Sequence, residues 1–162
     1  MGLSEVSNIL WRERQLLDLL LFKLEEEQLL LAAGKARWLG HATREVEAVL
    51  EQIRQAELFR AVEVHAAAKE LGLGPNPSLR ELVEAAPAPW NTILAEHRSS
   101  FAAAVTEITA LAKLNRALLA RGHKATEDAL AWLGENQAVE TYSPAGLAPA
   151  KRGGARLVNE AM

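Results

Sequence analysis

The sequence predicts an all-α protein: a long antiparallel helical hairpin, a third long helix in a coiled-coil-like bundle, one short helix and a disordered C-terminal tail. Leucine, alanine and glutamate dominate the 162 residues, and aromatic residues make up only 5%, which is a helical composition. A sustained seven-residue repeat is typical of the apolar seam of a long helix. Near the N-terminus such a repeat runs without a miss through Leu3, Leu10, Leu17, Leu24 and Leu31.

The first predicted helix covers residues 4–33, and its leucine repeat has two interpretations. In one, the leucines pair with those of a second chain in a parallel homodimer. In the other, they form a seam within the chain. The seam is favoured because the chain supplies two further helices with apolar stripes of their own. A homodimer, with or without exchange of helices, stays open at this point.

The second predicted helix covers about residues 43–71. Thr43 is the expected N-cap, and two glutamates follow in the first turn, where carboxylates suit the helix dipole. The stretch 71–73, Leu-Gly-Leu, predicts a glycine C-cap followed by an apolar residue. Residues 35–42 are either the turn between the two helices or a one-turn extension of a helix.

Residues 78–81 have the spelling of a capping box and start a short helix that ends before Pro87. Pro89 is expected in the first turn of the last helix, where proline is tolerated, and that helix covers about residues 90–134. Asn115 lies on its apolar seam. A buried asparagine there either sets the register of the helices or marks the end of the seam.

The lengths of the helices predict a binding surface. At about 1.5 Å per residue, the first two helices are each about 45 Å long and the last is about 67 Å, so its final turns overhang the hairpin. An apolar helix end without an intrachain partner is what a peptide-binding module exposes. The predicted cargo-binding residues are Leu118, Leu119, Leu130, Trp132 and Leu133. For Leu118 and Leu119, a place in the intrachain core is an equal alternative.

After Glu135 the composition changes. Residues 143–162 are rich in proline and glycine and carry three basic residues against one acid, which predicts a flexible basic tail. The expected domain organisation is therefore a helical bundle over residues 1–142 and a tail over residues 143–162.

Several functional classes are excluded by composition and spacing. The net charge is −3, whereas a nucleic-acid-binding protein needs a concentrated basic face, so this class is not expected. The chain has no cysteine, which removes disulfides and thiolate metal sites and fits a reducing compartment. The most apolar stretch, residues 16–24, is too short and too interrupted to span a membrane, and the N-terminus has no signal-peptide pattern.

No residue pattern supports catalysis or a cofactor. None of the histidines has the spacing of a metal-ligand motif, and there is no glycine-rich phosphate loop or supported catalytic triad. The run of three glutamates at 25–27 cannot converge on one atom, because consecutive helical residues point in different directions. We therefore expect neither an enzyme nor a bound cofactor or metal. The histidines are His41, His65, His97 and His123.

The second half of the chain resembles the FlgN family of flagellar export chaperones. The resemblance is carried by residues 114–122, Leu-Asn-Arg-Ala-Leu-Leu-Ala-Arg-Gly, and by residues 141–146, which match a Thr-Tyr-x-x-x-Gly element. The basic stretch Arg152-Gly153-Gly154 is similar to the tail of the family, and the order and spacing also match. The segment 73–89, with its short helix, departs from the simpler connection of many members.

The resemblance implies a cytoplasmic chaperone of type III secretion. Members of the family bind the disordered C-terminal segments of hook-associated proteins, prevent premature assembly and deliver them to the export apparatus. By resemblance, Tyr142 and Gly146 are the residues that dock on the export gate or the export ATPase complex. The alternative is a structural coiled-coil homo-oligomer without a client, which would have no need of the element from Tyr142 to Gly146.

Overall fold

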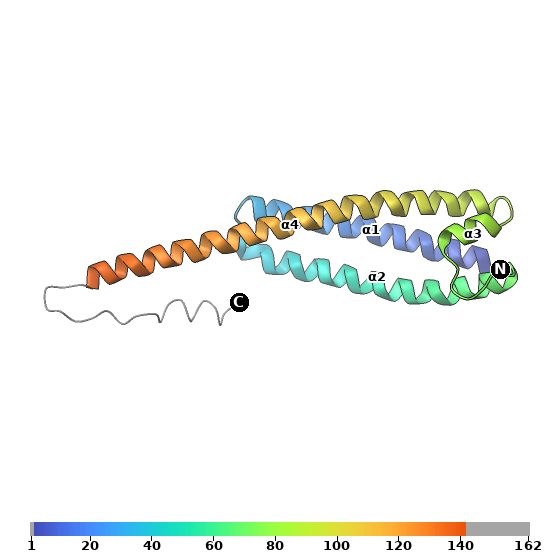
Figure 1. Cartoon of the computed structure of the whole chain (residues 1–162), viewed down its shortest axis with the longest axis horizontal. Coiled ribbons are helices and arrows are strands. Elements are labelled where there is room, and N and C mark those ends of the chain that lie inside the picture. The colour runs from blue at the N-terminus through green and yellow to red at the C-terminus, as the bar shows by residue number, and fades with distance from the viewer. Residues whose placement is uncertain (1, 142–162) are drawn as a thin grey trace. The chain divides into compact units, whose positions relative to one another are not determined.

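The computed structural model describes residues 2–141, and the side chains of residues 2–134 (Figure 1). It contains four helices, namely α1 (Gly2–Ala32), α2 (Ala36–Glu70), α3 (Leu79–Ala85) and α4 (Trp90–Thr141). No strand occurs among these residues, so the all-α prediction is confirmed. The predicted tail and its boundary at residue 143 lie outside the described residues. The chain divides into two compact units, residues 1–116 and 117–162.

Within the first unit, α1 and α2 form an antiparallel hairpin and have the most extensive contact of any two helices (Figure 1). The first part of α4 runs along α1 in the same direction. Two contacts fix this direction, since His97 meets Ser7 near the start of α1 and Asn115 meets Leu24 near its end. The predicted hairpin and the third long helix are therefore both present.

A tight glycine turn joins α1 to α2. Gly34 has a φ of +66°, a region that glycine adopts without steric cost. The N–H of Lys35 donates to the carbonyl of Leu30 at 2.9 Å, and the N–H of Gly34 donates to that of Leu31 at 3.2 Å. These two bonds are the Schellman pattern, which satisfies the last carbonyls of a helix.

Because this turn is so short, the prediction of Thr43 as an N-cap is wrong. Helix α2 begins at Ala36, with Lys35 at the N-cap and no side-chain cap. Thr43 instead lies inside α2, where its hydroxyl donates to a carboxylate oxygen of Glu27 across the hairpin at 3.4 Å. Residues 36–42 are therefore nearly two helical turns, more than the one-turn extension considered from the sequence.

The other local signals before α4 are confirmed. Gly72 has a φ of +70° and closes the end of α2 with the same pair of backbone bonds as Gly34. Ser78 and Glu81 form a complete capping box at the start of α3. Pro89, however, lies one residue before α4, so its expected place in the first turn is wrong.

Helix α4 continues to Thr141, beyond the predicted end near residue 134. The change in composition after Glu135 therefore does not mark the end of the helix. Residues 135–141 contain neither proline nor glycine, so nothing in them interrupts helical hydrogen bonding.

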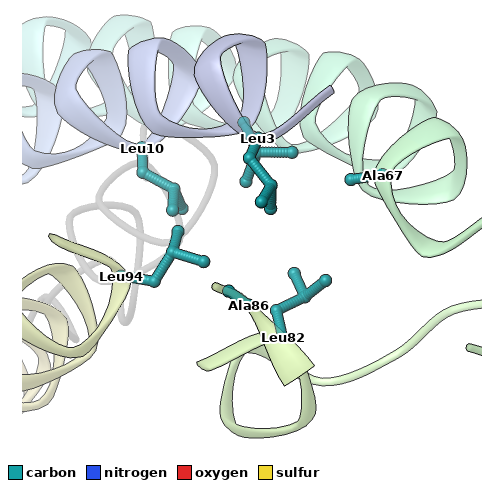
Figure 2. Packing of buried hydrophobic residues seen from close by; sticks show 7 residues of the cluster. Leu3, Leu10, Ala67, Leu82, Ala86 and Leu94 are labelled. Atoms are coloured by element: carbon teal, nitrogen blue, oxygen red, sulfur yellow. The ribbon is translucent and has the colours of Figure 1, made fainter. Parts of the chain in front are cut away.

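All four helices contribute to one end of the core. Figure 2 shows leucines from α1, α3 and α4 converging on each other beside Ala67 of α2. A second apolar cluster, formed by Leu20, Leu24, Val46 and Val49, lies nearer the turn between α1 and α2. Burial of these side chains is the main favourable term for the fold of the first unit. The first cluster consists of Leu3, Val6, Leu10, Ala67, Leu82, Ala86 and Leu94.

The leucine repeat of α1 faces the interior of its own chain. Leu3, Leu10 and Leu24 are buried, which confirms the intrachain seam. Leu17 and Leu31 are only half-buried. A helix has 3.6 residues per turn, so a strict seven-residue repeat drifts off the buried side. The buried positions between Leu10 and Leu24 are taken by Glu13, Leu16 and Leu20.

A buried carboxylate separates the two apolar clusters along α1. Glu13 is 3% exposed, and the guanidinium of Arg60 on α2 donates to its Oε2 at 2.7 Å. Its other oxygen, Oε1, is buried without a hydrogen-bond partner among the described residues. Burial raises the pKa of Glu13 above its ordinary value, and Glu57 adds to this rise, while Arg60 opposes it. The folded protein therefore binds a proton at this carboxylate more readily than the unfolded chain does.

A buried histidine joins α4 to α1. His97 is 1% exposed, and its Nδ1 lies 3.5 Å from a guanidinium nitrogen of Arg14, which can only donate. In the neutral ring, Nε2 then carries the hydrogen and donates to the hydroxyl of Ser7 at 3.3 Å. Trp11 packs edge-on against the ring at 5.0 Å. Burial, and secondarily Arg14, lowers the pKa of His97.

Asn115 is buried on the apolar seam of α4, as expected if it sets the register of the helices. Its amide donates to the backbone carbonyl of Leu24 at 2.8 Å and to Glu27 at 3.2 Å. A side chain that bonds one particular carbonyl permits only one axial position of α4 on α1. This contact therefore sets the register at the end of the first unit.

The raised pKa of Glu13 predicts the effect of Glu13→Gln. Because the folded pKa of Glu13 is raised, its protonation contributes stability that is fully present below the ordinary pKa of 4.5 and is lost as the pH rises through the higher folded value. Glutamine stays neutral and keeps an acceptor for Arg60. We expect the variant to be more stable than the parent at pH 7, by up to about 1 kcal/mol, with a gap that narrows as the pH falls toward 4.5.

Urea unfolding of both proteins across this pH range measures the gap. Glu84→Gln is the matched control, because Glu84 forms an exposed ion pair with Arg80, four residues earlier on α3. This control should show little change at any pH. A Glu13→Gln variant that is less stable at pH 7 would mean that the ion pair outweighs the cost of burying the carboxylate.

Candidate partner-binding surface

The five predicted cargo-binding residues lie on α4 within the second unit. Leu119, Leu130, Trp132 and Leu133 are between 37% and 60% exposed, and Leu118 is half-buried. None of the residues from 119 to 134 is buried. Four large apolar side chains are thus available on this segment for contact with a partner.

The helix brings these residues together as two groups rather than one. At 3.6 residues per turn, Leu119, Leu130 and Leu133 fall within about 60° of each other around the axis. Leu118 and Trp132 lie about 40° apart on a neighbouring side of the helix. The three leucines therefore share a face, and Trp132 is directed away from it.

Polar side chains separate the two ends of the leucine face. His123 and Glu127 contact each other at 3.2 Å, and the hydroxyl of Thr126 donates to the carbonyl of Gly122 at 2.9 Å. Leu119 and Leu130 are eleven residues apart, or about 16 Å along the axis. The surface thus offers two apolar contact points with a polar stretch between them, which suits an amphipathic helix with the same spacing.

A groove in the first unit is a further candidate that the sequence analysis missed. It has a volume of about 300 Å³ and lies between α1, α2 and the segment from Asn76 to α3. Most of its lining residues are apolar, and Arg60, Glu57 and Ser78 are among the polar ones. The sequence signal that could have led to it was the segment 73–89, which the helix pattern left as an unusually long connection with a short helix. The apolar residues of the groove are Val6, Leu10, Ala61, Val64, Pro77, Leu79 and Leu82.

The groove has the composition of a pocket for an apolar side chain. Arg60 is half-exposed, so the guanidinium that pairs with Glu13 inside the bundle also reaches the edge of the groove. The nearby Glu57 offsets its charge. Recognition here would therefore depend on apolar contact more than on charge.

Among the side chains of residues 2–134, no group of three or more histidine, aspartate or glutamate residues is placed to hold a metal ion. None of the described helices is both long and apolar enough to cross a membrane. The two residues predicted to dock on the export apparatus, Tyr142 and Gly146, lie outside the described residues.

Comparison with known protein families identifies this chain's relationship. A family model described as FlgN protein matches residues 1–150. The matched region includes the segment 73–89, the exposed part of α4 and the Thr-Tyr-x-x-x-Gly element. No curated protein and no solved structure matches the chain.

Replacing glycine by alanine is expected to have opposite effects on stability at two positions, Gly122 and Gly72. A Cβ at Gly122, inside α4, would meet no atom within 4 Å, so Gly122→Ala should stabilise the helix by about 1 kcal/mol. Gly72 has a φ of +70°, so Gly72→Ala should destabilise the bundle by about 1 kcal/mol. Amide hydrogen exchange of residues 117–134 measures the first effect, and a thermal melt of the bundle measures the second. Faster exchange in Gly122→Ala would contradict the prediction.

Proposed function

The chain belongs to the FlgN family of flagellar export chaperones, and on this premise we propose that it binds the C-terminal segments of hook-associated proteins. In this proposal the bound client cannot assemble prematurely, and the chaperone delivers it to the export gate. The protein acts in the cytoplasm, where the clients are made, and by binding rather than by catalysing a reaction.

The observation that carries the proposal is the exposed leucine face of α4. Leu119, Leu130 and Leu133 are large apolar side chains at helical spacing on one side of a helix. Single exposed leucines are ordinary, but several on one helical face mark a surface for a partner. A client segment that folds as an amphipathic helix would bury them and cover its own apolar side at the same time.

The delivery step rests on the tail element. Tyr142 and Gly146 lie in the stretch Thr-Tyr-Ser-Pro-Ala-Gly, which resembles the Thr-Tyr-x-x-x-Gly element of the family. A tyrosine combines a large apolar ring with a polar hydroxyl, a combination enriched at the centres of interfaces. We propose that Tyr142 contacts the export gate, or the export ATPase complex, while α4 holds the client.

The client site is tested by replacing both Leu130 and Leu133 with glutamate. A charge in the centre of an apolar contact must lose its hydration on binding, so affinity for the C-terminal segment of a hook-associated protein should fall at least about a hundredfold. Isothermal titration calorimetry with that segment measures the affinity, and circular dichroism checks helicity. Val105→Glu, an exposed site on the first part of α4, is the control and should bind normally. If the double variant loses helicity, these leucines have a structural role instead.

The docking role is tested with Tyr142→Ala. We expect client affinity and melting temperature to stay nearly unchanged, while capture by the cytoplasmic domain of the export gate weakens. Calorimetry, a thermal melt and a pull-down on the same variant separate the two jobs of the protein. A marked drop in melting temperature would instead indicate that the ring packs on the bundle. An unchanged pull-down would remove the proposed docking role.

A further inference from the structure

The outer face of α2 carries three strongly exposed apolar side chains that lie next to each other. Leu58, Phe59 and Val62 are 71%, 67% and 66% exposed. Leu58 and Val62 are four residues apart and Phe59 and Val62 are three apart, so the three side chains are neighbours on the helix surface. The face that packs on α1, which includes Ala56 and Ala67, lies on the opposite side of α2.

Leu58 and Val62 lie at the centre of a second coiled-coil pattern, which has no partner among the described residues, and Phe59 lies beside this pattern. The residues of this pattern are spaced alternately three and four positions apart along α2, and every one of them is exposed. The pattern is acidic at its beginning and basic at its end. Its residues are Ala48, Glu51, Gln55, Leu58, Val62, His65 and Lys69.

We propose that the chain forms a homodimer in which this face of α2 packs antiparallel on the same face of a second copy. With a two-fold axis near Arg60, residues whose numbers sum to 120 lie opposite each other. Leu58 then meets Val62 of the second copy, and Glu51 meets Lys69 of the second copy. Each pair occurs twice, as an interface with two-fold symmetry requires.

The order of charges selects the antiparallel arrangement. In a parallel pair each residue would face its own equivalent, so Glu51 would oppose glutamate and Lys69 would oppose lysine. Like charges in facing positions destabilise such pairs and opposite charges support them. The same register places the apolar residues opposite each other at the centre. It also pairs the opposite charges and places Gln55 opposite His65.

The size of the interface sets the strength of the dimer. The pairing from residue 51 to residue 69 is about 27 Å long. One helix on each side places the buried surface near the lower end of specific interfaces, at about 1,200 Å² or less. We therefore expect a dimer that forms and dissociates with concentration. It uses the first unit, so it does not depend on the client site proposed on α4.

Sedimentation equilibrium of the full chain from low to high micromolar concentration tests the dimer. The parent should move from monomer to dimer, and a variant with both Leu58→Glu and Val62→Glu should raise the dissociation constant about tenfold or more. Its thermal melt at low concentration should match the parent, because both sites are exposed. Leu29→Glu, on the exposed side of α1, is the control and should dimerise normally. A parent that stays monomeric at every concentration overturns the proposal.

Charge exchange tests the register. Glu51→Lys alone and Lys69→Glu alone should each weaken the dimer, because each places like charges opposite each other. The variant with both changes should recover the parent's dissociation constant, since both pairs are then restored with reversed signs. Failure of the double change to recover dimerisation would overturn the proposed register.

Cross-linking tests the direction of the helices, and the absence of native cysteine makes it simple. Glu51→Cys and Lys69→Cys chains should form a disulfide-linked dimer when mixed under mild oxidation, and neither should link efficiently to itself. Self-linking of each variant alone would indicate a parallel pair and contradict the proposal. If the Leu58 and Val62 variant instead loses binding to a client segment while the parent stays monomeric, this face binds clients and the homodimer is wrong.

Discussion

The first unit depends on the close approach of α1 and α2. Small residues on α2, among them Ala56, Ala67 and Ala68, are buried against α1, and a Cβ at Gly2 would lie only 3.0 Å from the backbone of Ala67. Small side chains let two helix backbones come close, and the leucines of α1 then fill the space on either side. Helices α3 and α4 pack against the surface that this pair creates. A larger side chain at Gly2 or Ala67 would separate the hairpin and disturb every later contact.

Polar groups in the core specify how the helices align. Leucines are interchangeable along a seam, so apolar packing alone would allow α4 to shift along α1. The contacts of His97 with Ser7 and of Asn115 with Leu24 lie at opposite ends of the first unit and fix one position. Glu13 and Asn115 each also bury one oxygen, Oε1 and Oδ1, that has no hydrogen-bond partner among the described residues. For Glu13 the buried group is a carboxylate, whose loss of hydration costs more than that of an amide. Its retention in the core is a cost that its pair with Arg60 offsets only in part.

Local signals in the sequence were sufficient where one residue decides the outcome. The glycine C-cap at Gly72 and the capping box from Ser78 to Glu81 depend only on neighbouring residues, and both were predictable. The start of α2 was not, because the turn at Gly34 made a later N-cap at Thr43 unnecessary. Glu13 could not be recognised as buried, since its partner Arg60 is 47 residues away in the chain. The exposed leucines of α4 were predictable from helix length, whereas the groove beside α3 required the path of the chain from Asn76.

The exposure of α4 after Asn115 has a consequence for the lifetime of any complex formed there. From residue 119 to residue 134 no side chain is buried, so helical order in this segment depends on intrinsic propensity and local pairs such as His123 with Glu127. Isolated helices of about 15 residues are marginal in water. Some of the free energy of association is therefore spent on holding the segment helical, which shortens the residence time of a bound partner. The partner would then dissociate readily because of the low stability of this helical segment, without a separate step that displaces it.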